Sequence, residues 1–225
     1  MTEKAWNHPI HAIIFDNDGT TLDTIPAYRE TTNMVIGCDY GDELQNKLNG
    51  MSEYKAAELV VNELHLDMTA QELIDRRKSL LHEKLADSQP FPGVADFIKR
   101  LKSKGYKVGL ATSGTRETTN LKFGKHKELL GLFDIVVCGD EVKNAKPSPE
   151  IFLTCASKLG SKPENSLVFE DTPNGIKAAN AANMPCALFT NGTEDYKKDS
   201  FGVKATYVFD NYSNFDESVF IWDKE

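Results

Sequence analysis

The sequence lacks any apolar run that approaches the ~18 residues of a membrane-spanning helix. Residues 1–9 contain no apolar stretch typical of a secretory signal. Only four cysteines are present, and none are spaced as Cys-x-x-Cys, which suits thiols in a reducing compartment. Internal repeats and low-complexity tracts are also missing. We therefore expect a cytoplasmic protein with no membrane partner.

Positive charge is also scarce. The 225 residues include 26 Lys and Arg against 34 Asp and Glu, which gives a net charge of −8 and a pI near 5.2. This balance argues against a nucleic-acid polymer or an anionic membrane as a partner. It does not argue against a small anion, because nearby cations or a metal ion can reverse the local field. The oligomeric state stays open, with a monomer favoured.

Short apolar runs alternate with helical patterns along most of the chain. We expect strands at residues 10–15, 108–111, 135–138, 167–169 and 187–189, with a weaker sixth at 207–209. Helical spacing covers residues 94–104, and Ser148-Pro149 and Thr172-Pro173 are typical helix starts. This alternation predicts an α/β fold with a Rossmann-like parallel sheet that helices cover on both faces.

The segment from residue 24 to residue 90 breaks this alternation. It contains no convincing strand, and its apolar residues recur at helical spacing. Thr69 and Glu72 are spaced as a capping box at the start of a helix. We therefore predict an α/β core domain over residues 1–23 and 91–225, with an α-helical domain inserted at residues 24–90.

Acidic and polar residues follow four of the predicted strands. In open α/β sheets, ligands bind beyond the carboxyl ends of the strands, so residues that follow different strands can converge there. The residues that we expect at this edge are Asp16 and Asp18, then Thr112, Ser113 and Gly114, then Lys146, and finally Glu170 and Asp171.

This group of residues suits the binding of a metal ion and a phosphate. The four acids would repel one another unless a cation lay among them, and hard oxygen ligands favour Mg²⁺. Lys146 adds a positive charge, and Thr112 adds a hydroxyl donor. The backbone N–H groups of Ser113 and Gly114, expected to enter a helix, would form an anion site. Any one of these features alone is more typical of a turn, a cap or surface charge, but their combined order favours phosphoryl transfer.

The same residues resemble the motifs of a known family. Asp16-Asn17-Asp18-Gly19-Thr20, Thr112, Lys146-Pro147 and Glu170-Asp171 are similar to the four motifs of the haloacid-dehalogenase (HAD) phosphatases. The resemblance covers nearly the whole chain, and the helical insertion resembles the cap domain of that family. Within the family, the chain resembles the group of pseudouridine-5′-phosphatases and β-phosphoglucomutases.

The resemblance implies a Mg²⁺-dependent phosphatase that hydrolyses a small phosphate monoester of a nucleoside, sugar or polyol. Asp16 would be the nucleophile and become an aspartyl phosphate. Asp18 would protonate the leaving oxygen and then activate water, and its backbone carbonyl would bind the metal. Thr112 and Lys146 would bind the transferred phosphoryl group. The implied metal ligands are Asp16, Asp18, Glu170 and Asp171.

Three other functions remain open. A β-phosphoglucomutase would have a histidine and an arginine where this chain has Tyr28 and Glu53, so a second phosphate would be poorly held and hydrolysis is favoured. A receiver-type phospho-acceptor also uses acids, Thr and Lys around Mg²⁺. Its acidic pair comes first along the chain, however, whereas the pair Glu170-Asp171 comes last here. A non-catalytic binding protein is disfavoured because all the expected catalytic side chains are present.

Overall fold

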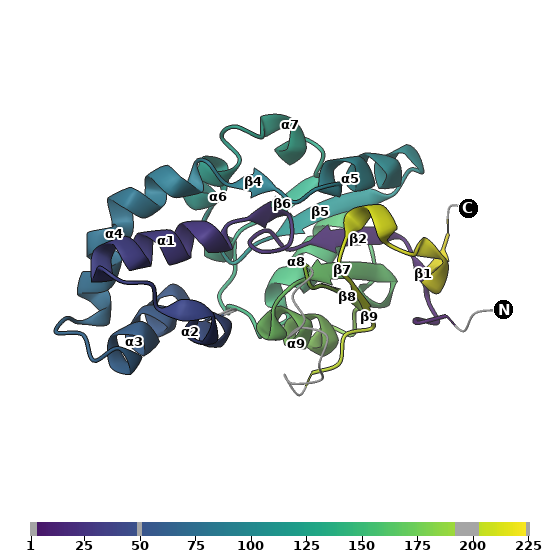
Figure 1. Cartoon of the computed structure of the whole chain (residues 1–225). Coiled ribbons are helices and arrows are strands. Elements are labelled where there is room, and N and C mark those ends of the chain that lie inside the picture. The colour runs from purple at the N-terminus through teal and green to yellow at the C-terminus, as the bar shows by residue number, and fades with distance from the viewer. Residues whose placement is uncertain (1–3, 49–50, 192–202, 224–225) are drawn as a thin grey trace. The chain divides into compact units, whose positions relative to one another are not determined.

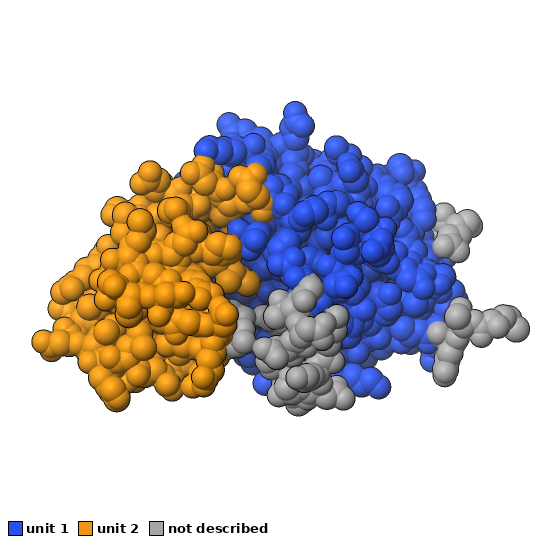
Figure 2. Space-filling view, in the orientation of Figure 1, with its two compact units in different colours: residues 1–23, 90–225 blue, residues 24–89 orange. Residues whose placement is uncertain are grey.

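The structure of the protein is a computed structural model that describes residues 4–48, 51–191 and 203–223. The chain forms two compact units, shown in different colours in Figure 2. The first unit comprises Met1–Asp23 and Pro90–Glu225, and the second comprises Thr24–Gln89. The second unit is therefore an insertion within the sequence of the first.

A parallel sheet of six strands forms the centre of the first unit (Figure 1). Its strand order is β6-β5-β2-β7-β8-β9, so β2 lies between the strands that the chain forms later. The strands are β2 (Ala12–Phe15), β5 (Lys107–Ala111), β6 (Ile135–Val137), β7 (Ser166–Glu170), β8 (Cys186–Phe189) and β9 (Tyr207–Phe209). The predicted parallel α/β sheet is confirmed, including its weaker sixth strand.

Side chains alternate along β2 and thereby supply two hydrophobic cores. Ala12 and Ile14 belong to one core with α8 (Glu150–Leu159) and α9 (Pro173–Ala181). Ile13 and Phe15 point to the opposite face. There they pack with α5 (Val94–Ser103) and with aromatic residues of the C-terminal segment. Burial on both faces explains why β2 is a continuous apolar run.

The predicted strand at residues 10–15 is wrong in one respect, because it divides into two strands at His11. The backbone N–H of His11 donates to the carbonyl of Asn165. The preceding pair, β1 (Pro9–Ile10), instead lies parallel to β10 (Ile221–Trp222) near the end of the chain. The C-terminal segment is thus tied to the edge of the core.

Tyr212 links the C-terminal segment to the loop that follows β2. Its ring is fully buried, and its hydroxyl donates to the Thr20 carbonyl over 2.9 Å. Tyr212→Phe would leave this carbonyl buried without that donor, so we expect it to lower the free energy of unfolding by about 1–2 kcal/mol. Denaturant unfolding would measure the change, with Tyr54→Phe as the control, because Tyr54 is exposed. Equal stabilities for wild type and Tyr212→Phe would contradict this role.

Two predicted helix starts in the first unit have different outcomes. Thr172 precedes α9, and its hydroxyl accepts from the Gly175 N–H as a cap, as predicted. The predicted start at Ser148 is wrong by one residue, because α8 begins at Glu150 and Pro149 lies before its first helical position. The Ser148 hydroxyl still accepts from the Glu150 N–H, over 3.4 Å.

The second unit consists mainly of helices with their own core. The helices are α1 (Ile25–Ile36), α2 (Gly41–Leu48), α3 (Glu53–Glu63) and α4 (Ala70–Leu85). The predicted capping box is confirmed at the start of α4: the Thr69 hydroxyl accepts from the Glu72 N–H, and the Glu72 carboxylate accepts from the Thr69 N–H. The expectation that the insertion contains no strand is wrong at its end, where β4 (Gln89–Pro90) pairs with β3 (Leu22–Asp23).

No helix among the described residues combines the length and the apolar character that crossing a bilayer requires.

Candidate active site

The loop after β2 is held in a tight turn. The Asn17 carbonyl accepts from the backbone N–H groups of Thr20, Thr21 and Leu22. Gly19 has a φ of +85°, and a Cβ atom there would lie 2.1 Å from Asp171 Oδ2, so any larger residue would clash. The loop therefore approaches the acid that follows β7 as closely as its backbone allows.

Thr21 anchors the carbonyl of the candidate nucleophile. Its hydroxyl donates to the Asp16 carbonyl oxygen over 2.6 Å, while the Asp16 N–H donates to the Phe169 carbonyl over 2.9 Å. Thr21 is fully buried, so this hydrogen bond satisfies a hydroxyl that would otherwise be costly. Both bonds fix the backbone from which the Asp16 side chain projects.

Lys146 joins two acids at the carboxyl ends of neighbouring strands. Its ammonium nitrogen lies 2.5 Å from Asp16 Oδ1 and 2.8 Å from Glu170 Oε1. All three side chains are buried, and Lys146 Nζ also lies 4.6 Å from the centre of the Phe152 ring. The structure therefore brings Asp16, Lys146 and Glu170 together at the carboxyl ends of β2 and β7.

Glu170 and Asp171 have different surroundings. Glu170 Oε2 accepts from the N–H groups of Asp171 and Thr172 and from the Thr172 hydroxyl, at 2.6–2.9 Å. Asp171 Oδ1 accepts from the Thr20 hydroxyl over 2.8 Å. A Cβ atom at Gly175 would lie 1.8 Å from the Glu170 carboxylate, so α9 can start this close only with glycine there. Glu170 is thus held by Lys146 and by the start of α9.

The loop after β5 contributes Thr112 but not the expected helical anion site. Helix α6 (Arg116–Lys122) begins after Thr115, so Ser113 and Gly114 precede it and the expectation that they enter a helix is wrong. The Gly114 N–H donates to the Thr112 hydroxyl over 3.1 Å, and Ser113 is exposed. A hydroxyl that accepts one hydrogen bond still has its own proton to donate, so Thr112 can bind an anion.

A second lysine, absent from the sequence prediction, lies beside Asp18. The Lys122 ammonium nitrogen is 2.6 Å from Asp18 Oδ1, and the lysine side chain is only 2% exposed. Its position could have been inferred from helical spacing, because Thr115, Thr119 and Lys122 recur on one face of the helix that follows the Thr112 loop. Each candidate acid after β2 thus pairs with its own lysine.

Burial dominates the electrostatics of the acids. It raises the pKa of Asp16 to about 7, against the opposing effect of Lys146 and with smaller contributions from Glu170 and Asp18. Burial, followed by the charges of Glu170 and Asp16, also raises the pKa of Asp171 well above its usual range. For Lys146 burial would lower the pKa, but Asp16 and Glu170 outweigh it and raise the pKa. With all three acids ionised, the site would therefore hold more negative charge than Lys146 neutralises.

The donor set fits a divalent cation. Asp16, Glu170 and Asp171 are buried, and Lys146 is the ammonium group that hydrogen-bonds to two of them, since Lys122 pairs with Asp18. Two negative charges are left over when these carboxylates are ionised, which matches the charge of Mg²⁺. Since Mg²⁺ commonly retains waters and uses only one or two carboxylates, Asp16 and Asp171 are sufficient candidates, with Glu170 orienting Lys146.

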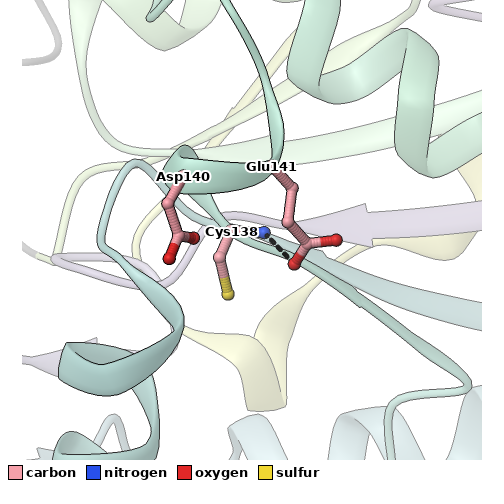
Figure 3. A group of neighbouring side chains, drawn as sticks. All are labelled: Cys138, Asp140 and Glu141. Atoms are coloured by element: carbon pink, nitrogen blue, oxygen red, sulfur yellow. Dashed lines mark hydrogen bonds between the residues drawn. The ribbon is translucent and has the colours of Figure 1, made fainter.

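A second cluster of possible metal ligands lies elsewhere in the first unit, and its ligand atoms are close together. Among the described residues, Cys138, Asp140 and Glu141 are the one set of three His, Cys, Asp or Glu side chains whose ligand atoms all lie within 4.8 Å of one another (Figure 3). Glu141 accepts from the Cys138 N–H over 3.1 Å and pairs with Arg116 and Lys158, while Asp140 accepts from the Arg116 N–H. These contacts already neutralise the cluster, so we assign no metal to it.

A family model for haloacid dehalogenase-like hydrolases matches residues 10–183. The chain belongs to this family. The match begins at Ile10, the last residue of β1, and extends beyond α9, so it includes every candidate site residue described above. The HAD-like chain is therefore an enzyme of the hydrolase class, and its parallel sheet is the Rossmann-like core of that family.

Two relatives of this HAD-like hydrolase are named as phosphatases. The chain is 32% identical over 228 residues to the "Probable pseudouridine-5'-phosphatase" of Drosophila melanogaster, covering 98% of this chain and 97% of the relative. It is 34% identical over 182 residues to the "Phosphorylated carbohydrates phosphatase" of Thermotoga maritima, covering 78% and 82%. A crystal structure of β-phosphoglucomutase from Clostridium difficile has the same fold, with a TM-score of 0.71, 24% identity and coverage of 93% and 94%.

Proposed function

We propose that this HAD-like hydrolase is a Mg²⁺-dependent phosphatase that cleaves a small phosphate monoester through phosphorylation of Asp16. The substrate is a phosphorylated nucleoside, sugar or polyol, a range supported by the names of the two phosphatase relatives. The observation that carries the proposal is the contact between Asp16 and Lys146, 2.5 Å apart and both buried. A buried carboxylate beside an ammonium group can attack a phosphorus atom whose oxygens the same ammonium binds.

Each residue of the site has a separate role in this reaction. Lys146 and the Thr112 hydroxyl bind oxygens of the phosphoryl group, and Thr21 and Phe169 hold the backbone of Asp16. An Asp16 carboxylate oxygen forms a bond to phosphorus as the bond from phosphorus to the leaving oxygen breaks. Water then forms a bond to phosphorus, and the bond to Asp16 breaks. The products are the alcohol and inorganic phosphate.

Asp18 carries the proton through both steps. In the first step its carboxyl group gives a proton to the leaving oxygen, and in the second its carboxylate takes a proton from the attacking water. Asp18 thus ends the cycle in the state in which it began. Asp16 and Asp171 would hold Mg²⁺, together with the backbone carbonyl of Asp18. Bound Mg²⁺ supplies a positive charge that neutralises the phosphoryl oxygens and the carboxylates.

The main alternative is a phosphosugar mutase of the β-phosphoglucomutase type. Its second phosphate needs a cation in the inserted unit, and Arg77 of α4 lies beside the two positions where this chain departs from the mutases. Its guanidinium lies 5.5 Å from the centre of the Tyr28 ring and 3.0 Å from a carboxylate oxygen of Glu53. Because Glu53 neutralises Arg77, little positive charge is left for a second phosphate, and we favour hydrolysis.

Incubation with β-glucose 1-phosphate and a bisphosphate activator separates these two functions. A phosphatase releases inorganic phosphate, whereas a mutase accumulates glucose 6-phosphate. We expect release of phosphate, and a panel of phosphorylated nucleosides, sugars and polyols would then rank the substrates. Accumulation of glucose 6-phosphate without free phosphate would rule out the phosphatase proposal.

The surplus of buried carboxylates predicts an effect of Mg²⁺ on stability. Mg²⁺ at about a hundredfold excess over its Kd should stabilise the wild type by ~2.7 kcal/mol and raise its melting temperature. Asp171→Asn removes one surplus charge, so without metal it should be more stable than wild type by on the order of 1 kcal/mol. It should gain little from Mg²⁺.

Thermal unfolding in EDTA and in Mg²⁺ would measure both effects. Asp96→Asn is the matched control, because Asp96 lies on α5 and its side chain is 87% exposed. It should melt like wild type in both solutions. A wild type that melts at the same temperature in EDTA and in Mg²⁺ would contradict the proposed metal site.

A further inference from the structure

Lys122 comes from a part of the sequence outside the motifs that defined the candidate site. It is the last residue of α6, 104 positions after Asp18, yet its ammonium nitrogen lies 2.6 Å from Asp18 Oδ1. The Lys122 side chain is 2% exposed and that of Asp18 is 30% exposed. A buried ammonium group is costly unless it has an anionic partner, so this pairing is a built feature of the site.

The same ammonium group lies close to the loop that contains Thr112. A Cβ atom placed on Gly114 would lie 3.5 Å from the Thr112 hydroxyl oxygen, 3.7 Å from that of Thr119 and 3.8 Å from Lys122 Nζ. Lys122 thus contacts Asp18 and also lies near Gly114, in the loop of the residue that the proposed function assigns to phosphoryl binding. Helix α6 fixes this position, because its first residues continue from the Thr112 loop.

We propose that Lys122 is a positioning residue that sets the orientation of the Asp18 carboxyl group for proton transfer. The inference rests on the proposed function, in which Asp18 exchanges a proton with the leaving oxygen and with water. A hydrogen bond to Oδ1 restricts rotation of the carboxyl group and so fixes the direction of Oδ2, which also lies 3.4 Å from Asn17 Nδ2. Small errors in the direction of a proton donor are costly in rate.

The charge of Lys122 assists the same residue. Each time Asp18 gives up its proton, a carboxylate is left in a partly buried place, and the adjacent ammonium group stabilises it. When water attacks the phosphorylated Asp16, the proton released by water goes to Asp18 and the pair returns to its starting state. Lys122 itself keeps its proton throughout and forms no bond to phosphorus.

The test is a kinetic comparison of Lys122→Met and Lys122→Arg with wild type on two substrates. Phenyl phosphate has a poorer leaving group than 4-nitrophenyl phosphate and depends more on protonation. We expect Lys122→Met to lower kcat by about 10–10²-fold on phenyl phosphate and several-fold less on 4-nitrophenyl phosphate, with KM nearly unchanged. Lys122→Arg retains the charge and should recover much of the loss. Lys99→Met, on the exposed face of α5, is the matched control.

A double-mutant cycle with Asp18→Asn gives the second measurement. If Lys122 acts through Asp18, adding Lys122→Met to Asp18→Asn should change kcat by less than about threefold. Equal losses on both substrates with a raised KM would instead make Lys122 a phosphate-binding residue and overturn the inference. A full additional loss in the Asp18→Asn background would overturn it as well.

These outcomes are separable from a failure of the proposed function. A wild-type protein that hydrolyses neither ester in Mg²⁺ would overturn the phosphatase proposal and this inference together. If the wild type hydrolyses both esters, but Lys122→Met loses equally on both substrates and has a raised KM, only the role of Lys122 is overturned. Melting temperatures of every variant would separate a loss of folding from a loss of rate.

Discussion

Asp16→Asn should lower kcat by at least about 10⁴-fold on any phosphate ester that the protein hydrolyses, because an amide oxygen is a very poor nucleophile. The amide has the size of the carboxyl group and can still accept a hydrogen bond from Lys146. Substrate binding should therefore persist, and the loss should fall on kcat rather than on KM. Steady-state kinetics with 4-nitrophenyl phosphate in Mg²⁺ would measure both constants.

Asp96→Asn is again the control for this substitution. It makes the same chemical change on the exposed side of α5 and should leave kcat and KM at their wild-type values. The melting temperature of Asp16→Asn should not fall, since the substitution removes a buried charge. If Asp16→Asn kept more than about one-tenth of the wild-type kcat, Asp16 would not be the nucleophile.

Asp18→Asn has the second-largest expected effect, a loss of about 10²–10⁴-fold in kcat. Asparagine can still accept a hydrogen bond from Lys122 through its amide oxygen, but it cannot carry a proton between the leaving group and water. Both chemical steps should slow. Kinetics on phenyl phosphate and 4-nitrophenyl phosphate would measure the loss, which should be greater for the poorer leaving group.

The second step, in which water attacks the phosphorus atom, leads to a further expected result for Asp18→Asn. If this variant still phosphorylates Asp16 with a good leaving group, the phosphorylated protein should accumulate, because no base activates water. Mass measurement of the intact protein during turnover would detect this species. A variant that lost less than about threefold in kcat and accumulated nothing would show that Asp18 does not transfer the proton.

The ends of the strands were predictable from the sequence, and with them much of the candidate site. Asp16, Lys146 and Glu170 each follow an apolar strand or the loop after one, and parallel strands bring such residues to one edge. The central strands β2 and β8 were visible because burial on both faces demands unbroken apolar runs. The apolar runs and the rule that sites lie beyond the carboxyl ends of parallel strands were together enough to predict these residues.

The residues that support the site were not predictable in the same way. Lys122 and Tyr212 reach the loop after β2 from positions 104 and 192 residues away. Helical spacing places Lys122 on the same face of α6 as Thr119, but it does not show that Lys122 meets Asp18, and nothing in the local sequence distinguishes Tyr212 from an ordinary core tyrosine. Thr21 was not among the predicted site residues, but its hydroxyl donates a hydrogen bond to the Asp16 carbonyl. Such contacts depend on how distant segments pack, and local periodicity does not encode that.

The inserted unit shows the same difference between local and distant signals. The capping box at Thr69 was predictable because it is encoded within four residues. The partner of Glu53 was not, because Arg77 reaches it from another helix. Reasoning from the missing arginine alone therefore overlooked a cation that the fold supplies and that Glu53 neutralises.

Chemical trapping of the phosphorylated enzyme tests the central claim most directly. The wild type would be mixed with 4-nitrophenyl phosphate and Mg²⁺, quenched in acid within a turnover and reduced with borohydride, which converts an aspartyl phosphate to homoserine. Peptide mass analysis should find homoserine at position 16, and none in Asp16→Asn or in EDTA. A protein that turns over the ester yet gives no modification, or gives it at another aspartate, would contradict the assignment of Asp16 as the nucleophile.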